Sequence, residues 1–248
     1  MLTILASCVM YHALAAWIGN KTEPHTIETR TQLEIDNKVG RPPKRLFPFI
    51  LAIFHAITST YLSGCVCLLW ISKYTQTDIK FMVTPLTRFT ISMSAGYFIW
   101  EVSDEHRNPQ YADFLDYAHG WMSFAAYVVI GFWLEQWHFF LCIYLCVMES
   151  STIFLNCYSI SNWFTININI KYAIWVKIST VIFVISWILC RICGQTILLY
   201  YIISALLVDL HKPTIDIADA LPFILIITVI VQTYLITLRI YRAATKKL

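Results

Sequence analysis

Apolar runs of about 20 residues recur along the whole of this 248-residue chain, and they constrain its fold more than any motif does. A helix needs about 20 apolar residues to cross the ~30 Å hydrocarbon core of a bilayer. Hydrophobic residues make up 58% of the chain and charged residues only 13%, whereas soluble domains carry about 25% charged residues. The sequence therefore predicts an all-α membrane protein with several transmembrane helices.

Seven predicted spans account for the apolar runs: 2–19, 47–71, 85–102, 114–134, 137–160, 172–208 and 218–238. The sixth is overlong and fits either one tilted helix or two short ones. With seven spans, the loops on one side and the C-terminal tail carry twelve Lys and Arg residues, against three on the opposite side. The positive-inside rule then places the N-terminus outside and the tail inside. Splitting the sixth span would move the basic tail to the other side, so seven spans are favoured.

The segments outside the spans are short, and the only sizeable polar one is 20–46. Its mixed charges and its Pro42-Pro43 pair predict a surface connector, with room for a short interfacial helix. The first span lacks a preceding basic residue, so we expect a retained helix and not a cleaved signal peptide. The net charge of +3 is small and spread along the loops, so no nucleic acid partner is indicated.

Eight cysteines lie in or beside the apolar spans. Cys190 and Cys193 form a C-x-x-C pair, but no second pair and no histidine cluster completes the four ligands of a zinc site. We interpret the cysteines as small buried apolar residues, and we expect neither a metal nor a cofactor.

Polar side chains inside the predicted spans need a partner or a purpose, because an ionisable group at membrane depth costs at least about 2.5–3.5 kcal/mol. Such side chains fall on several different spans, which favours a shared interior over a lipid-facing surface. The residues expected to line it are His55, Tyr97, Glu101, His119, Glu149, Thr152, Asn156, Arg191 and Gln195.

Two interpretations of this interior remain open. In the first, Arg191 pairs with Glu149 or Glu101, and the histidines hydrogen-bond across helices and hold them together. In the second, the polar faces line a cavity, and His119 is a general base oriented by Asp116, three residues earlier on the same helix face.

Four stretches, in order, resemble the TLC family, the TRAM/LAG1/CLN8 homology domain that includes the ceramide synthases and smaller TLC-domain membrane proteins. They are RLFPFILAIFHAI (45–57), SAGYFIWE (94–101), ESSTIFLN (149–156) and WILCRICGQTILLYY (187–201). The family usually has an aspartate where Glu101 stands, and a proline where Ile153 stands. The resemblance implies six helices around a lipid-accommodating cavity, residues 45–248, preceded by one peripheral helix and the connector, residues 1–44.

In the family, the helix that follows the stretch matched by SAGYFIWE usually begins with two adjacent histidines. Ceramide synthases need this pair for acyl transfer from acyl-CoA to a sphingoid amine. Here His119 is followed by Gly120. Neighbouring helical residues point about 100° apart, so one histidine cannot fill both places. We therefore expect a non-catalytic multi-pass protein that binds lipid in its helical bundle.

That protein would act in membrane lipid organisation or as an accessory subunit of a larger membrane complex, such as a respiratory-type assembly. Its expected partners are membrane lipids, phospholipid or sphingolipid, and other membrane protein subunits. The alternative is a ceramide synthase-like acyl-CoA-dependent N-acyltransferase with His119 as general base. A seven-helix receptor is disfavoured, because the motifs typical of its third and seventh spans are absent. The resemblance implies the endoplasmic reticulum, with the mitochondrial inner membrane as the alternative.

Overall fold

The structure is a computed structural model that describes residues 2–35, 46–73, 84–109, 114–130, 138–168 and 173–210, together with 227, 230, 231, 233, 234, 237 and 238. Its helices are α1 (Leu2–Ile35), α2 (Leu46–Lys73), α3 (Pro85–Arg107), α4 (Phe114–Phe124), the π-helix η2 (Ala125–Ile130), α6 (His138–Ile168), α7 (Ala173–Trp187), the π-helix η4 (Ile188–Gly194) and α8 (Gln195–Leu210).

The all-helical fold class is confirmed over these residues, but the number of helices differs from the prediction. The described helices form six continuous bodies, one fewer than the seven predicted spans. The difference arises at 218–238, where most residues lie outside the described part of the chain. The end of the predicted connector, 36–45, lies outside it as well.

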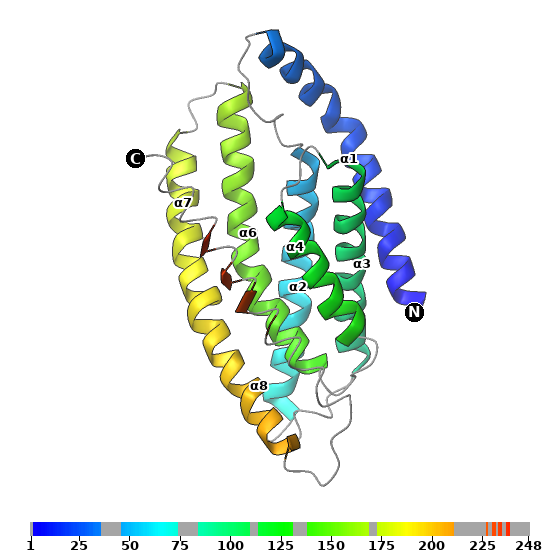
Figure 1. Cartoon of the computed structure of the whole chain (residues 1–248), viewed down its shortest axis with the longest axis vertical. Coiled ribbons are helices and arrows are strands. Elements are labelled where there is room, and N and C mark those ends of the chain that lie inside the picture. The colour runs from blue at the N-terminus through cyan, green and yellow to red at the C-terminus, as the bar shows by residue number, and fades with distance from the viewer. Residues whose placement is uncertain are drawn as a thin grey trace.

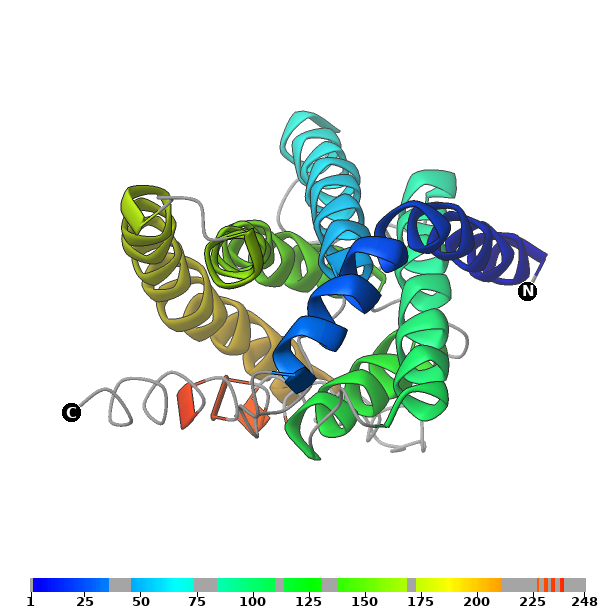
Figure 2. The ribbon, with the colours of Figure 1, turned by 90° about the horizontal axis from the view of Figure 1, so that it is seen from above.

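The helices form an elongated bundle with α2 and α6 packed together at its centre (Figure 1). Helix α3 packs against α1 and α4 on one side of this pair, and α7 packs against α6 on the other. The end-on view shows the same order, with α1 and the α7–α8 helix at opposite edges (Figure 2). Large side chains fill the interior between these helices, among them Tyr11, Leu51, Phe98, Tyr127, Leu141, Tyr144 and Leu145.

The first helix is longer than the sequence suggested. The polar segment 20–46 was predicted to be a connector, but α1 continues without interruption to Ile35. At 1.5 Å per residue, 34 helical residues span about 51 Å, well beyond the ~30 Å hydrocarbon core. Hydropathy reports where the helix leaves the hydrocarbon and not where it ends, because helical hydrogen bonds are internal to the chain.

The overlong sixth span is one continuous helix. Residues 173–210 run through α7, η4 and α8 without a turn. The backbone keeps right-handed helical angles at both ends of η4, with φ −63° and ψ −46° at Trp187 and φ −69° and ψ −36° at Gln195. Of the two possibilities for the sixth span, one long helix or two short ones, the structure shows the single long helix.

Three described segments are long and apolar enough to cross a membrane: Leu46–Leu69, Phe140–Ser161 and Ile174–Tyr200. Within α1, Thr3–Gly19 is a shorter apolar stretch. The α7 face turned away from α6 exposes large apolar side chains such as Trp175, Val181 and Ile185. In a bilayer such a face needs no protein partner, since lipid tails are as apolar as the side chains.

Candidate functional site

His55 of α2 lies at the centre of an aromatic and hydroxyl cluster. The hydroxyl oxygens of Tyr11 and Ser59 each lie 3.1 Å from its Nδ1 atom. The imidazole stacks on the Tyr97 ring with centroids 4.0 Å apart and planes 4° apart, and the edge of Phe98 meets it. Only 1% of His55 is exposed. His55 therefore packs α1, α2 and α3 together, and the surrounding rings and hydroxyl groups shield its imidazole from solvent.

Tyr97 continues this network towards the end of α3. Its hydroxyl donates to Oε1 of Glu101, 3.2 Å away and one turn later. The second oxygen, Glu101 Oε2, is buried and has no hydrogen-bond partner among the described residues. Glu101 also interacts electrostatically with Asp116 of α4 and with Glu149 of α6, so acidic side chains from three helices approach one another here.

His119 and Asp116 lie on α4, both partly buried. The His119 ring meets Phe98 of α3 edge to face, with centroids 6.2 Å apart. The next residue, Gly120, is buried, and a Cβ atom placed there would lie 3.1 Å from both Glu105 Oε2 and Val102 Cγ2 of α3. A second imidazole could begin here only if these side chains of α3 shifted.

Arg191 is held by the π-helical geometry of η4. At the end of this segment the Gln195 N–H group bonds to the carbonyl of Cys190, five residues earlier. The extra residue in such a turn rotates the helix face, and single π turns are often found at functional sites. Arg191 and Gln195, four residues apart, both turn towards α6 and are 4% and 2% exposed, while the intervening Ile192 is 45% exposed.

The Arg191 guanidinium bonds to one turn of α6 through uncharged oxygens. Its Nε donates to Ser151 Oγ at 2.8 Å, and its Nη2 donates to the Met148 carbonyl at 3.1 Å and to Thr152 Oγ1 at 3.0 Å. Glu149 lies in the same turn, is 6% exposed and interacts electrostatically with the guanidinium. One interpretation expected Arg191 to pair with Glu149 or Glu101. Glu149 interacts electrostatically with the guanidinium, but the hydrogen bonds of Arg191 go to Ser151, Met148 and Thr152.

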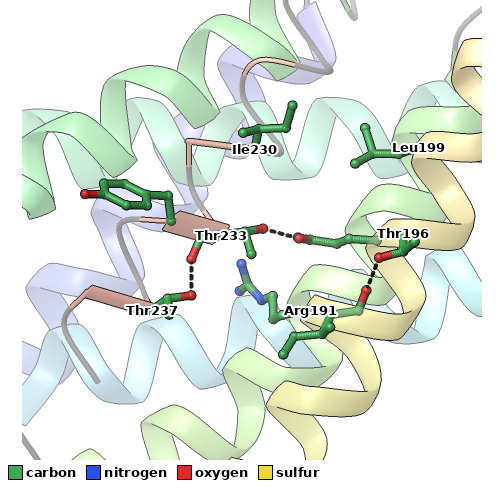
Figure 3. Close-up of a pocket in the computed structure, with 9 residues that line it drawn as sticks. Arg191, Thr196, Leu199, Ile230, Thr233 and Thr237 are labelled. Atoms are coloured by element: carbon green, nitrogen blue, oxygen red, sulfur yellow. Dashed lines mark hydrogen bonds between the residues drawn. The ribbon is translucent and has the colours of Figure 1, made fainter. Parts of the chain in front are cut away.

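Gln195 links α8 to α6 and to the segment that follows α8. Its Nε2 donates to the Met148 sulfur, and its Oε1 accepts from the Thr233 hydroxyl (Figure 3). On α6, Asn156 donates to the Thr152 carbonyl at 3.0 Å, within its own helix. These contacts place Arg191, Gln195, Thr152 and Asn156 in a second cluster, beside α6.

Glu149 connects the two clusters. It interacts electrostatically with Tyr97 and Glu101 on one side and with Arg191 on the other. Eight of the nine residues expected in a shared interior thus belong to these two clusters or connect them, while His119 is partly buried and contacts the Phe98 ring. Within the described residues, no three His, Cys, Asp or Glu side chains are grouped as a metal site would require.

Helical spacing places Ser59 on the face of His55, and Ser151 lies in the polar run that follows Glu149, so the sequence indicates both. Three further residues with central contacts were not predicted: Tyr11, Met148 and Thr233. Tyr11 and Thr233 come from distant segments, and Met148 contributes a carbonyl and a sulfur, which no polar pattern reports.

Comparison with known protein families identifies the chain. Residues 46–242 match the TLC domain of the TRAM, LAG1 and CLN8 proteins. The chain belongs to the TLC family. Neither a curated protein nor a solved structure gives a significant match. The matched region starts at the first residue of α2, so the TLC domain contains both clusters except for the contribution of Tyr11 from α1.

Proposed function

We propose that this TLC-family protein binds lipid in its helical bundle and has no acyl-transferase centre at His119. It would act in membrane lipid organisation or as an accessory subunit of a larger membrane complex. The observation that carries the proposal is the packing at Gly120. Because a Cβ atom at Gly120 would lie 3.1 Å from both Glu105 Oε2 and Val102 Cγ2, this position contributes to the contact between α3 and α4, and a second histidine would need these side chains to shift.

The surroundings of His55 support the same function. A base must reach the proton it abstracts, whereas the His55 ring is covered by Tyr97, Phe98 and two hydroxyl groups. The polar interior at this level is therefore best explained as interhelical packing. In membrane proteins such hydrogen bonds contribute about 0.6 kcal/mol each on average, so several of them acting together are needed to fix the helices.

The proposed topology has seven spans, with the TLC bundle of six helices and α1 at its edge. The charge asymmetry of the loops supports an outer N-terminus and an inner C-terminal tail. The chain is an integral membrane protein, and the endoplasmic reticulum is the proposed location, by analogy with the family, with the mitochondrial inner membrane as the alternative.

Native mass spectrometry of the full chain, extracted gently from its own membrane, tests the proposal. We expect phospholipid or sphingolipid masses bound in stoichiometric amounts, with or without partner subunits of defined mass. A chain that carries no lipid under conditions in which other membrane proteins of the same extract retain theirs would contradict the proposal.

The acyl-transferase alternative is tested on the same material. The purified chain is incubated with a sphingoid base and a long-chain acyl-CoA, beside a His119→Ala variant. We expect no N-acyl product from either. Product from the native chain that disappears in the variant would establish the enzyme and refute the non-catalytic function.

A further inference from the structure

A cavity of about 330 Å³ lies beside η4 and α8, at the second cluster. Its lining residues are Arg191, Ile192, Gln195, Thr196, Leu199, Ile230, Thr233, Tyr234 and Thr237 (Figure 3). A water molecule takes about 30 Å³ of liquid volume, so the space corresponds to roughly ten waters. That is the lower end of the ~300–1,000 Å³ typical of small-molecule sites.

One hydrogen-bond donor in the wall of this cavity is unused. The Nε and Nη2 atoms of Arg191 bond to α6, but Nη1 is buried and has no hydrogen-bond partner among the described residues. The side chain is 96% buried, being only 4% exposed, and it points towards the space beside Thr233 and Thr237 (Figure 3). Each Nη atom of a guanidinium carries two N–H groups, and a buried donor left unsatisfied is costly.

The threonine hydroxyls around the cavity already donate hydrogen bonds within the protein. Thr196 donates to the Ile192 carbonyl at 2.6 Å, Thr237 donates to the Thr233 carbonyl at 2.6 Å, and Thr233 donates to Gln195. Beside these bonded hydroxyls, Nη1 of Arg191 is a donor that has no hydrogen-bond partner among the described residues. The rest of the wall is mainly apolar, formed by Leu199, Ile230 and neighbouring side chains.

We propose that this cavity binds the oxyanion head of an acyl-chain lipid, a carboxylate or a phosphate. One of its oxygens accepts hydrogen bonds from Nη1 of Arg191, and the chain lies against Leu199 and Ile230. Hydrogen bonds between a guanidinium and an oxyanion are about twice as strong as neutral ones. The three oxygens that accept hydrogen bonds from Arg191 are all neutral. An entering anion would add a charged acceptor.

The position of Arg191 in the membrane favours a lipid over a soluble anion. Arg191 lies nine residues before Tyr200, the end of the candidate span, which is about 13 Å at 1.5 Å per residue. Any oxyanion loses water on reaching this depth, but a lipid is already held in the bilayer, and its chain can pack against the apolar wall formed by Leu199 and Ile230. The inference rests on the proposed lipid-binding function and specifies which site takes the charged end.

The test uses the full chain in phosphatidylcholine nanodiscs and measures oleate binding by native mass spectrometry and by titration. Thr196→Phe and Thr237→Phe fill the cavity, and each loses only a hydrogen bond to a carbonyl of its own segment, so the bonds of Arg191 remain. Thr180→Phe is the matched control, because Thr180 also bonds only to a carbonyl one turn earlier, at 2.7 Å, and does not line the cavity. Arg191→Gln removes the charge.

We expect about a tenfold or greater loss of oleate affinity in both cavity-filling variants and in Arg191→Gln, since a bond to a charged group is lost. The Thr180→Phe control should bind like the native chain. Phosphatidic acid added to the nanodiscs should compete with oleate, and inorganic phosphate should not.

Each contrary result has its own meaning. Unchanged oleate affinity in the cavity-filling variants would overturn the site while leaving lipid binding intact. Competition by inorganic phosphate as strong as by phosphatidic acid would make this a soluble-anion site and overturn the lipid assignment. A native chain that binds neither oleate nor any other lipid would remove the proposed function itself.

Discussion

The contact between α1 and α3 leads to a sharp prediction at Gly96. A Cβ atom on this residue would lie 2.5 Å from Ser7 Cβ, 2.7 Å from the Cys8 nitrogen and 2.8 Å from the Ser7 carbonyl carbon. Non-bonded heavy atoms such as carbons pack best at about 3.5–4.0 Å. Two of the three atoms belong to the backbone, so a side-chain rotation cannot relieve the overlap. Gly96→Ala must therefore move α1 away from α3 by about 1 Å.

This movement also reaches the His55 cluster. Tyr11 lies one turn after Ser7 on α1, and its hydroxyl oxygen is 3.1 Å from His55 Nδ1. A displacement of about 1 Å would take that pair beyond hydrogen-bond distance. Overpacking of this kind costs typically about 1–3 kcal/mol, and the weakened hydrogen bond adds about 0.5–1.5 kcal/mol.

Gly64→Ala is the matched control, because nothing lies within 4 Å of a Cβ atom added at Gly64 of α2. Both substitutions replace a helical glycine, so both gain the same helix propensity, about 0.5–1 kcal/mol. The difference between the two variants then isolates the overlap at Gly96.

Thermal unfolding in a mild detergent, followed by circular dichroism, measures this difference. For a chain of this length 1 kcal/mol corresponds to about 2–4 °C, so the two costs together should make Gly96→Ala unfold about 3–18 °C below Gly64→Ala. Adding Ser7→Gly should restore only part of the loss, since the backbone atoms of α1 remain in the way. Equal or greater stability of Gly96→Ala would refute the close approach of these helices.

Three further substitutions test the other contacts by the same unfolding assay. Gly194→Ala should destabilise the chain, because its Cβ would lie 2.9 Å from Val147 Cγ1, and Val147→Ala should rescue it; a loss that the second change leaves untouched would contradict this contact. Tyr11→Phe should cost about 1 kcal/mol, and less if His55 is already Leu; additive losses would refute their hydrogen bond. Ser151→Ala should cost about 1.5–3 kcal/mol by removing an acceptor of a charged group; a neutral result would mean that the guanidinium is held by its other partners alone.

The sequence predicts well those features that depend on spacing within one helix. The apolar runs locate the described helices to within a few residues at most ends, and the i to i+4 rule pairs Tyr97 with Glu101 and brings Arg191 and Gln195 to one face. The family resemblance is confirmed by the TLC match. Each of these inferences needs only local periodicity or a linear motif.

The remaining features depend on contacts between segments that are distant in the sequence. Tyr11 meets His55 across 44 residues, and Arg191 meets Ser151 across 40. The acceptors of Arg191 lie on α6, 39 to 43 residues away in the chain, and hydropathy does not report them. The polar extension of α1 was also missed, since the signal used for its end was the loss of apolar character.

Each polar cluster contains a buried atom without a hydrogen-bond partner among the described residues, Glu101 Oε2 in the first and Arg191 Nη1 in the second, but Arg191 also lines a cavity. Around His55, hydroxyl and imidazole groups pair within one tightly packed set, as expected of residues that hold helices together. At Arg191 a buried charged donor remains beside an open cavity. Packing alone would not favour that combination, because a larger apolar side chain at Thr196 or Leu199 could fill the space. An unused donor and an unfilled cavity at one place are more simply explained if a ligand supplies both the missing acceptor and the missing volume.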